Sequence, residues 1–322
     1  MNSIPDFTGP KPLHLGERLE RGYSFASKLL LFGEYGLMFD AMALSVPFQR
    51  FSGQLAYDEL GQDHESTAEI RKFFDHLQHI DFRENSDFIF DLEMMDNDLK
   101  KGLYFKSNIP QQYGVGSSGA LVAALFENYG QVKNSAASDN IEILKSIFAQ
   151  LEGFFHGKSS GLDPLISYLN KPILIDSKKQ ISQVEFDLNK SGLAIALIDT
   201  ETTGATGPLV QHFIDLFNLL EFKQAFEKQF IPANNGCIES LLNGDKSGFF
   251  LNLEQLIRFE VYHFHRMIPA HFHRVISHAI CSKVYIKLLG SGGGGFLLAF
   301  AESSDVFDQW SKKSGIELLP IV

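Results

Sequence analysis

The sequence has two cysteines, one tryptophan and no long hydrophobic run. Cys237 and Cys281 are far apart, which is typical of a reducing compartment rather than of a disulfide-stabilised domain. No apolar stretch approaches the roughly 20 residues of a transmembrane helix, and the first residues have neither a basic start nor an apolar run. We therefore expect a cytoplasmic protein with no signal peptide and no membrane partner.

Positive charge is also scarce. Lys and Arg number 28 against 39 Asp and Glu, the net charge is −11, and no basic block stands out. Nucleic acid is therefore not an expected partner, and an anionic ligand would need local lysines or arginines. A chain of 322 residues suggests about two domains or one large one. We interpret the 30 phenylalanines as core-filling residues.

The most informative stretch is glycine-rich and spans residues 108–120. Gly114, Gly116 and Gly119 let the backbone approach a ligand closely, and Ser117 and Ser118 precede an apolar segment that predicts a buried helix. A loop of this kind at a helix N-terminus predicts an anion site, with phosphate as the expected anion. Two alternatives stay open. One is a dinucleotide-binding turn, which residues 110–113 disfavour by separating strand from glycine, and the other is a turn that only caps the helix.

Three charged residues are candidates for a functional role. Lys28 lies in a strand predicted over 23–32, where it needs an anionic partner unless it sits at the strand edge with its head in water. Glu152 flanks the apolar face of a helix predicted over 139–155, which we expect Asp139 and Glu142 to cap. Asp163 follows a loop rich in Gly and Ser, and it is either a catalytic carboxylate or a helix N-cap.

Other motifs are less specific. Gly157-Lys158-Ser159 does not fit a P-loop, because the required earlier glycine is Glu152 and a helix precedes it. Residues 290–295 form a second glycine loop between strands predicted over 285–289 and 296–300, and the entropy cost of consecutive glycines needs a reason. The histidines between His263 and His278 show no tight metal-ligand pattern, so a metal site there is disfavoured.

Taken together, three segments resemble the GHMP kinase superfamily in order and spacing. They are residues 28–35 (Lys-Leu-Leu-Leu-Phe-Gly-Glu-Tyr), 110–120 with Gly-Val-Gly-Ser-Ser, and 287–295 (Lys-Leu-Leu-Gly-Ser-Gly-Gly-Gly-Gly). Residues 152–163 are most similar to the mevalonate kinase branch. The resemblance implies a two-domain α+β protein: a ribosomal protein S5 domain 2-like ATP-binding domain over 1–188 and a ferredoxin-like C-terminal GHMP kinase domain over 189–322. ATP and substrate would bind between these domains.

The resemblance also implies roles for individual residues. Asp163 is then the catalytic acid/base on the substrate hydroxyl, with Lys28 close to it to stabilise developing charge, and Ser118 and Glu152 hold Mg²⁺. The residues expected to face the substrate are Glu34, Tyr35 and Thr206. The residues expected to bind ATP through their backbone are Gly114, Val115, Gly116, Ser117, Ser118 and Gly119, together with Gly292, Gly293 and Gly294.

The implied function is that of an ATP-dependent kinase acting on a small-molecule hydroxyl, most closely that of mevalonate in isoprenoid precursor synthesis. Tyr35 stands where mevalonate kinases usually carry His, Gly207 where Arg is frequent, Ser159 where Pro is usual and Phe296 where Cys is common. Tyrosine after Gly-Glu also occurs in phosphomevalonate kinases, which are the alternative within the superfamily. A non-catalytic nucleotide-binding regulator is the alternative of another class, which Lys28, Glu152 and Asp163 disfavour. A homodimer is left open.

Overall fold

The computed structural model of the protein describes residues 23–58, 64–80, 87–134, 138–157, 159–204 and 206–321. Backbone contacts divide the chain into two compact units that are interleaved in the sequence. Unit 1 comprises Met1–Ser27, Gln49–Ile109 and Ser118–Leu169, and unit 2 comprises Lys28–Phe48, Pro110–Ser117 and Asn170–Val322. The predicted domain boundary after residue 188 is a different, linear division, and it stays a prediction.

Two long strands are shared between the units. Strand β1 (Phe25–Phe32) begins in unit 1 and ends in unit 2, and β2 (Ala43–Tyr57) runs the other way. Within unit 1, the end of β2 pairs with β4 (Leu103–Ser107) in an antiparallel register from Gly53↔Ser107 to Tyr57↔Leu103. Within unit 2, the start of β2 pairs with β6 (Ile173–Ile175), which in turn pairs with β7 (Ile181–Gln183).

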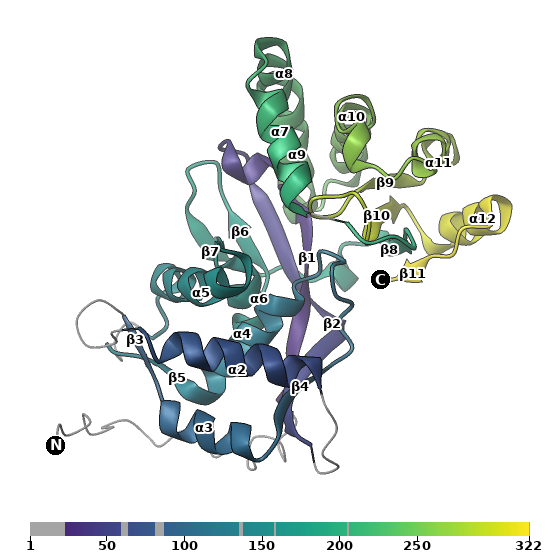
Figure 1. Ribbon diagram of the computed structural model, residues 1–322. Coiled ribbons are helices and arrows are strands. Elements are labelled where there is room, and N and C mark those ends of the chain that lie inside the picture. The colour runs from purple at the N-terminus through teal and green to yellow at the C-terminus, as the bar shows by residue number, and fades with distance from the viewer. Residues whose placement is uncertain are drawn as a thin grey trace. The chain divides into compact units, whose positions relative to one another are not determined.

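The remainder of unit 1 is mostly helical. Helix α2 packs against α3 and β4, and α5 packs against α6 (Figure 1). The short strands β3 and β5 pair antiparallel, from Phe88↔Val132 to Phe90↔Gly130. The elements are α2 (Glu65–Leu77), β3 (Phe88–Phe90), α3 (Leu92–Lys100), α4 (Ser117–Tyr129, whose first residue is in unit 2), β5 (Gly130–Val132), α5 (Ile141–His156) and α6 (Leu162–Leu169).

Two helices of unit 1 carry predicted site residues. Helix α4 is apolar on all sides and is buried from Gly119 to Phe126, as a helix without a polar face must be. Helix α5 buries Leu144, Phe148 and Leu151 at helical spacing, which confirms the predicted amphipathic helix. The predicted cap was wrong, because the side chain of Asn140, not Asp139, accepts hydrogen bonds from Glu142 N and Ile143 N.

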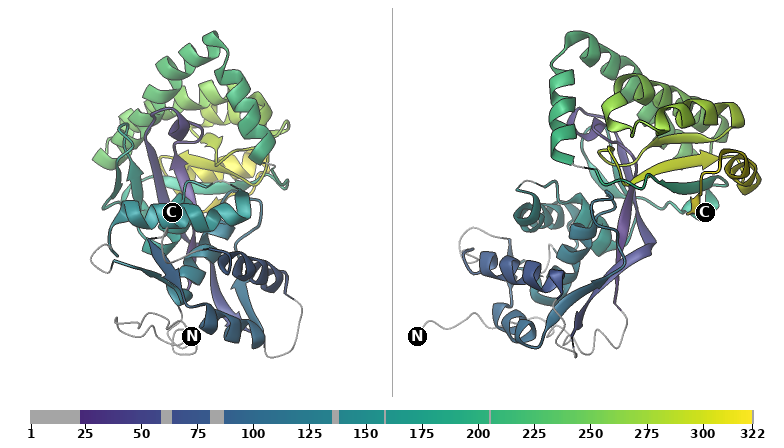
Figure 2. Two further views of the ribbon diagram at one scale, coloured as in Figure 1. Left: turned by 60° about the vertical axis from the view of Figure 1, so that its left-hand side comes forward. Right: turned by 45° about the vertical axis from the view of Figure 1, so that its right-hand side comes forward.

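Unit 2 is built on a second antiparallel sheet with strand order β11-β8-β10-β9. Strand β10 (Phe296–Ala301) is buried throughout and pairs with β8 (Ala194–Asp199) from Phe296↔Asp199 to Ala301↔Ala194. Helices α10 and α11 pack on β9 (Figures 1 and 2). The other elements are η1 (Gly36–Met38), η3 (Leu188–Lys190), α7 (Thr206–Phe217), α8 (Leu220–Ala225), the π-helix η4 (Phe226–Phe230), α9 (Ile231–Asn243), α10 (Lys246–His263), η5 (His265–Met267), α11 (Phe272–Ala279), η6 (Ile280–Ser282), β9 (Tyr285–Leu288), α12 (Ser304–Ser314) and β11 (Leu319–Pro320).

Phenylalanines fill both cores, as the composition predicts. In unit 1, Phe73, Phe88 and Phe148 are fully buried. In unit 2, helices α7 to α10 contribute a continuous aromatic cluster with ring centroids 4.5–6.4 Å apart, formed by Phe213, Phe217, Phe222, Phe226, Phe230, Phe259 and Phe264. The mixed helix and sheet architecture confirms the predicted α+β class.

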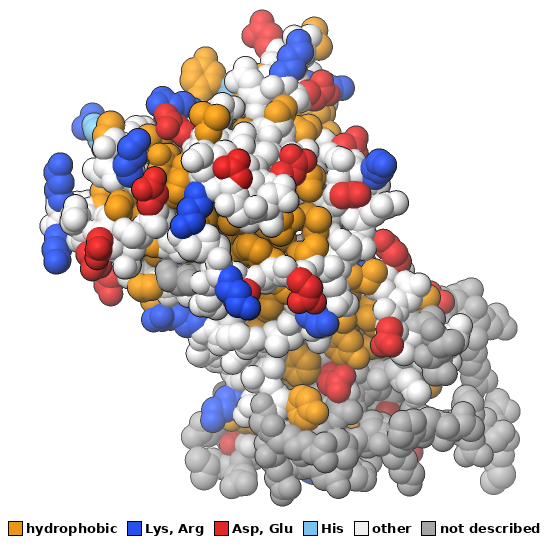
Figure 3. All heavy atoms as spheres, turned by 180° about the vertical axis from the view of Figure 1, so that it is seen from behind, with side chains coloured by type: hydrophobic (Ala, Val, Ile, Leu, Met, Phe, Trp, Pro, Cys, Tyr) orange, Lys and Arg blue, Asp and Glu red, His pale blue; other side chains and the backbone are white. Residues whose placement is uncertain are grey.

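The surface carries charges of both signs. On the face shown in Figure 3, Lys and Arg side chains are interspersed with Asp and Glu side chains. For an anionic ligand on that face, individual cations rather than a broad basic surface would have to offset the net charge of −11. Within the described ranges, the structure has no helix with the length and apolar character that crossing a bilayer requires.

Candidate active site

The first glycine loop lies in unit 2 and is bound to the strand that carries Lys28. The backbone N–H of Lys28 donates to Val115 O over 2.9 Å. Gly114 and Gly116 have φ of +73° and +81°, a left-handed region that favours glycine. Helix α4 begins at Ser117, so the loop ends at a helix N-terminus, as predicted for an anion site.

The second glycine loop, residues 290–295, packs against the first loop within unit 2. A Cβ added to Gly295 would stand 2.8 Å from Tyr113 O. Gly293 N donates to Met267 O over 2.5 Å, Gly295 N donates to Thr202 O over 2.7 Å, and Thr200 Oγ1 donates to Gly295 O over 2.7 Å. The consecutive glycines therefore allow backbone to pack on backbone. This close packing explains why the chain has glycines here despite their entropy cost on folding.

The loop before α7 contacts the same glycines. A Cβ on Gly204 would lie 2.6 Å from Gly292 O, and one on Gly294 would lie 2.6 Å from Gly204 N. Thr206 is the first residue of α7, and its side chain lies outside the part of the chain that the structure describes. Its expected role near the substrate stays a prediction.

Lys28 is buried in β1 with 7% of its surface exposed, which excludes the alternative of a strand-edge lysine with its head in water. Burial raises the pKa of the Glu34 carboxyl, against opposing effects of the positive charges of Lys287 and, to a smaller extent, of Lys28. Lys28 and Glu34 therefore lie within electrostatic range of each other in unit 2.

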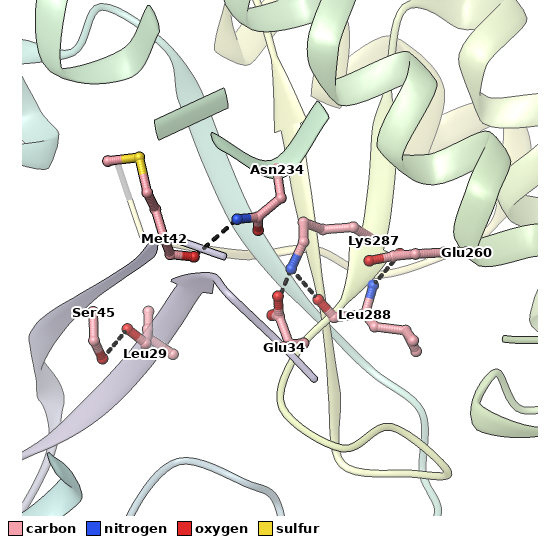
Figure 4. Close-up of polar contacts among 8 residues, drawn as sticks. All are labelled: Leu29, Glu34, Met42, Ser45, Asn234, Glu260, Lys287 and Leu288. Carbon is pink, nitrogen blue, oxygen red and sulfur yellow. Dashed lines mark hydrogen bonds and ion pairs between the residues drawn. The ribbon is translucent and has the colours of Figure 1, made fainter. Parts of the chain in front are cut away.

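Glu34 belongs to a buried charged cluster that the sequence interpretation did not foresee (Figure 4). Its Oε1 accepts a hydrogen bond of 2.6 Å from Lys287 Nζ, and Lys287 is fully buried. Glu260 Oε2 accepts from Leu288 N over 2.9 Å, while its buried Oε1 has no hydrogen-bond partner within the described ranges. Burial raises the pKa of the Glu260 carboxyl to about 8, with a further increase from the negative charge of Glu34, against opposing effects of Lys287 and of Leu288 N–H.

Tyr35 has an unusual backbone and a buried ring. Its φ of +57° is rare for a residue with a side chain. The ring stacks on Phe213 at a centroid distance of 4.6 Å, and the hydroxyl donates to Ser291 O over 2.6 Å. Burial raises the pKa of this hydroxyl well above its usual value, so it acts as a hydrogen-bond donor at neutral pH.

Unit 1 brings the two predicted metal ligands together. Ser118 Oγ lies 3.3 Å from Glu152 Oε1 and donates to it. Ser159 Oγ donates to the other oxygen of Glu152, which is 4% exposed. His156 Nε2 lies 2.8 Å from Ser118 Oγ, a contact that sequence reasoning missed. Glu152 and His156 are four residues apart on α5 and therefore share one face, which was the available signal.

Asp163 lies beside this pair in unit 1. A Cβ on Gly119 would stand 2.8 Å from Asp163 Cβ, so α6 packs directly on α4 one residue after Ser118. Asp163 is the second residue of α6, inside the first turn, so the N-cap alternative was wrong. Asp163 belongs to unit 1 and Lys28 to unit 2, and their proposed pairing stays a prediction.

The histidine-rich segment forms no ligand cluster. His265 and His273 stack on each other with ring centroids 3.7 Å apart. Over the residues with described positions, no group of three or more His, Cys, Asp or Glu could hold a metal ion.

Comparison with family models relates residues 85–171 to one family. The family model described as "GHMP kinases N terminal domain" matches residues 85–171. This segment contains the first glycine loop, Ser118, Glu152 and Asp163. A search of the curated proteins finds no significant match to the chain.

Several solved structures are similar over nearly the whole chain. The Lin0012 protein from Listeria innocua has a TM-score of 0.64 at 16% identity, covering 92% of this chain and 96% of that chain. Phosphomevalonate kinase from Streptococcus pneumoniae, in complex with phosphomevalonate and AMPPNP, has a TM-score of 0.63 at 14% identity, covering 92% and 98%. The L. major mevalonate kinase in complex with R-mevalonate has a TM-score of 0.59 at 18% identity, covering 90% and 89%. At these identities the similarity establishes the fold.

Proposed function

We propose that this chain is an ATP-dependent kinase of the GHMP superfamily that phosphorylates a hydroxyl group of a small molecule, with mevalonate as the preferred candidate acceptor. The match of residues 85–171 to the N-terminal domain of GHMP kinases and the fold shared with solved kinases support this proposal. The observation that carries the proposal is the grouping of Ser118, Glu152 and Asp163 around the start of α4. A glycine loop that only binds nucleotide needs no carboxylate of this kind. The combination favours an enzyme over a regulator on the same fold.

Phosphoryl transfer requires positioning and charge neutralisation more than covalent chemistry. In the proposed reaction, Asp163 accepts the proton of the acceptor hydroxyl as the new phosphorus–oxygen bond forms and ADP leaves. Lys28 stabilises the charge on the transferred group. The backbone N–H groups of the first glycine loop and the N-terminus of α4 bind the phosphates.

The Ser118–Glu152 pair fits a magnesium ion. Mg²⁺ prefers hard oxygen ligands and usually keeps waters and substrate phosphates beside one or two protein groups. Ser118 Oγ and Glu152 Oε1 supply two such oxygens 3.3 Å apart, and Ser159 fixes the orientation of the carboxylate. When bound, the ion would neutralise charge on the phosphates of ATP.

The acceptor is proposed from the similarity of the site segment to known kinases. Mevalonate is favoured because residues 152–163 resemble the mevalonate kinase branch. Phosphomevalonate is the second candidate because Tyr35 follows Gly-Glu and because a phosphomevalonate kinase is among the similar structures. Turnover of ATP with mevalonate, phosphomevalonate and galactose as acceptors distinguishes them.

The catalytic role is tested by Asp163→Asn. This change keeps the shape of the side chain and removes the base, so kcat should fall by roughly 10²-fold or more while the affinity for AMPPNP stays unchanged. Asp305→Asn is a matched control, because Asp305 also lies in the first turn of a helix, α12. A folded Asp163→Asn variant with near-normal kcat would refute the proposed mechanism.

A further inference from the structure

Glu34 and Tyr35, at the end of the segment 28–35, are connected by hydrogen bonds to the second glycine loop and to the strand end before it. We propose that Glu34 and Tyr35 are positioning residues that hold residues 288–291, and through them the second glycine loop, in the conformation that binds nucleotide. Glu34 acts through Lys287, which binds both Glu34 and the backbone of Leu288. The proposal rests on the proposed kinase function, and it assigns Glu34 and Tyr35 to the nucleotide side of the reaction rather than to the acceptor.

The first arm of this arrangement runs from Glu34 to the end of β9 (Figure 4). Lys287 Nζ donates both to Glu34 Oε1 and to Leu288 O, and its side chain has no exposed surface. Glu260 accepts from Leu288 N. Strand β9 is at the edge of its sheet, and both backbone groups of Leu288 are thus bound by side chains instead of by another strand.

The second arm is the Tyr35 hydroxyl. It donates to Ser291 O at 2.6 Å, three residues beyond Leu288 and inside the glycine loop. The Tyr35 ring packs against both Phe213 and Phe264, with centroid distances of 4.6 and 5.3 Å. Its φ of +57° is a strained conformation for a residue with a side chain, and such a conformation persists only where the surroundings determine it.

The two arms complement the other contacts of the loop. Met267 and Thr202 bind the backbone of Gly293 and Gly295. Tyr35 and Lys287 bind the preceding part, at Ser291 and Leu288. A glycine loop has many accessible backbone conformations, so such contacts are needed to keep its other N–H groups preorganised for phosphate. Removal of one arm should therefore loosen residues 288–291 more than the remainder of unit 2.

The test uses Tyr35→Phe, which keeps the stacked ring and removes the hydroxyl. Amide hydrogen exchange of peptides covering residues 285–296 should become faster, and the affinity for AMPPNP should fall about five-fold, the usual effect of one neutral hydrogen bond. The KM for the acceptor should not change. Tyr129→Phe is the matched control, because Tyr129 OH donates to Asp98 Oδ2 over 3.1 Å in the buried core of unit 1.

The outcomes are distinct. Unchanged exchange of residues 285–296 in Tyr35→Phe overturns the proposal, and so does an equal acceleration in Tyr129→Phe, which would mean a global effect. Faster exchange with unaltered AMPPNP affinity also overturns it. If the natural protein binds AMPPNP and Tyr35→Phe weakens that binding, but no acceptor is phosphorylated, the positioning role stands and the proposed reaction fails.

A second variant tests the arm of Glu34 separately. Glu34→Gln keeps an acceptor for Lys287 and removes the charge, so exchange should accelerate at residues 288–290 and the acceptor KM should stay constant. A rise in the acceptor KM with unaltered AMPPNP affinity would instead assign Glu34 to the acceptor site and overturn its positioning role. The exchange experiment requires no nucleotide, so it decides the question independently of turnover.

Discussion

Replacing Glu260 by Gln should change how the stability of unit 2 depends on pH. In the natural protein the buried carboxyl has a pKa of about 8, against 4.5 for an unperturbed glutamate. Between these two values the folded state binds a proton that the unfolded state has released. The contribution of Glu260 to stability is therefore fully present below about pH 4.5, and it is lost as the pH rises to about 8.

The magnitude follows from proton linkage. Where the folded state binds one more proton than the unfolded state, the free energy of unfolding falls by about 1.4 kcal/mol for each unit by which the pH rises. The amide introduced by Glu260→Gln does not titrate, and it resembles the neutral glutamic acid in shape. The stability of Glu260→Gln relative to the natural protein should thus rise by roughly 2–3 kcal/mol from pH 6 to pH 8 and level off above the pKa.

Tryptophan fluorescence makes the assay specific to unit 2. Trp310 is the single tryptophan of the chain and is buried in α12 of this unit. Urea unfolding followed by its emission at pH 6, 7, 8 and 9 gives the free energy difference at each pH. Glu302→Gln, an exposed position in the same unit, controls for the loss of one formal charge. A difference between Glu260→Gln and the natural protein that is constant over this range would refute the assignment of a neutral buried carboxyl.

Two further changes test other parts of the candidate site. Gly204→Ala would place a Cβ 2.6 Å from Gly292 O, so the affinity for AMPPNP should fall by about ten-fold or more. Gly207→Ala is the control, because nothing lies within 4 Å of its added Cβ. Equal affinities of the two variants would contradict the backbone packing described above. Glu152→Gln weakens one oxygen ligand and should raise the Mg²⁺ concentration that gives half-maximal turnover by about ten-fold or more; an unaltered Mg²⁺ dependence would remove Glu152 from the metal site.

Local patterns predicted the regular elements well. The apolar runs of β1 and β10 and the helical spacing in α5 are properties of neighbouring residues, and single-sequence reasoning can use them. No element was predicted for the region from α8 to α9, where Pro232 and Gly236 disfavour a helix. In the structure the backbone stays helical from α8 through the π-helix η4 into α9, and Pro232 is the second residue after the π-helix.

Contacts between residues that are distant in sequence could not be predicted in this way. Lys28 was singled out because a lysine in an apolar strand needs an anion, and the same argument applies to Lys287 in β9. Its partner Glu34 is 253 residues away, and no local pattern identifies such a pair. Neither could composition reveal that Lys28–Phe48 and Pro110–Ser117 belong to a unit completed by the C-terminal half.

The interleaving of the two units has a consequence for biosynthesis. During translation, Lys28–Phe48 leaves the ribosome long before β8, β9 and β10 of the same unit are made. At a synthesis rate of roughly 5–20 residues per second, the segment waits on the order of ten seconds or more for its partners. For that interval the apolar residues of β1 and β2 are exposed to solvent or to a chaperone. Slow translation of residues 170–301 should therefore lower the yield of folded protein.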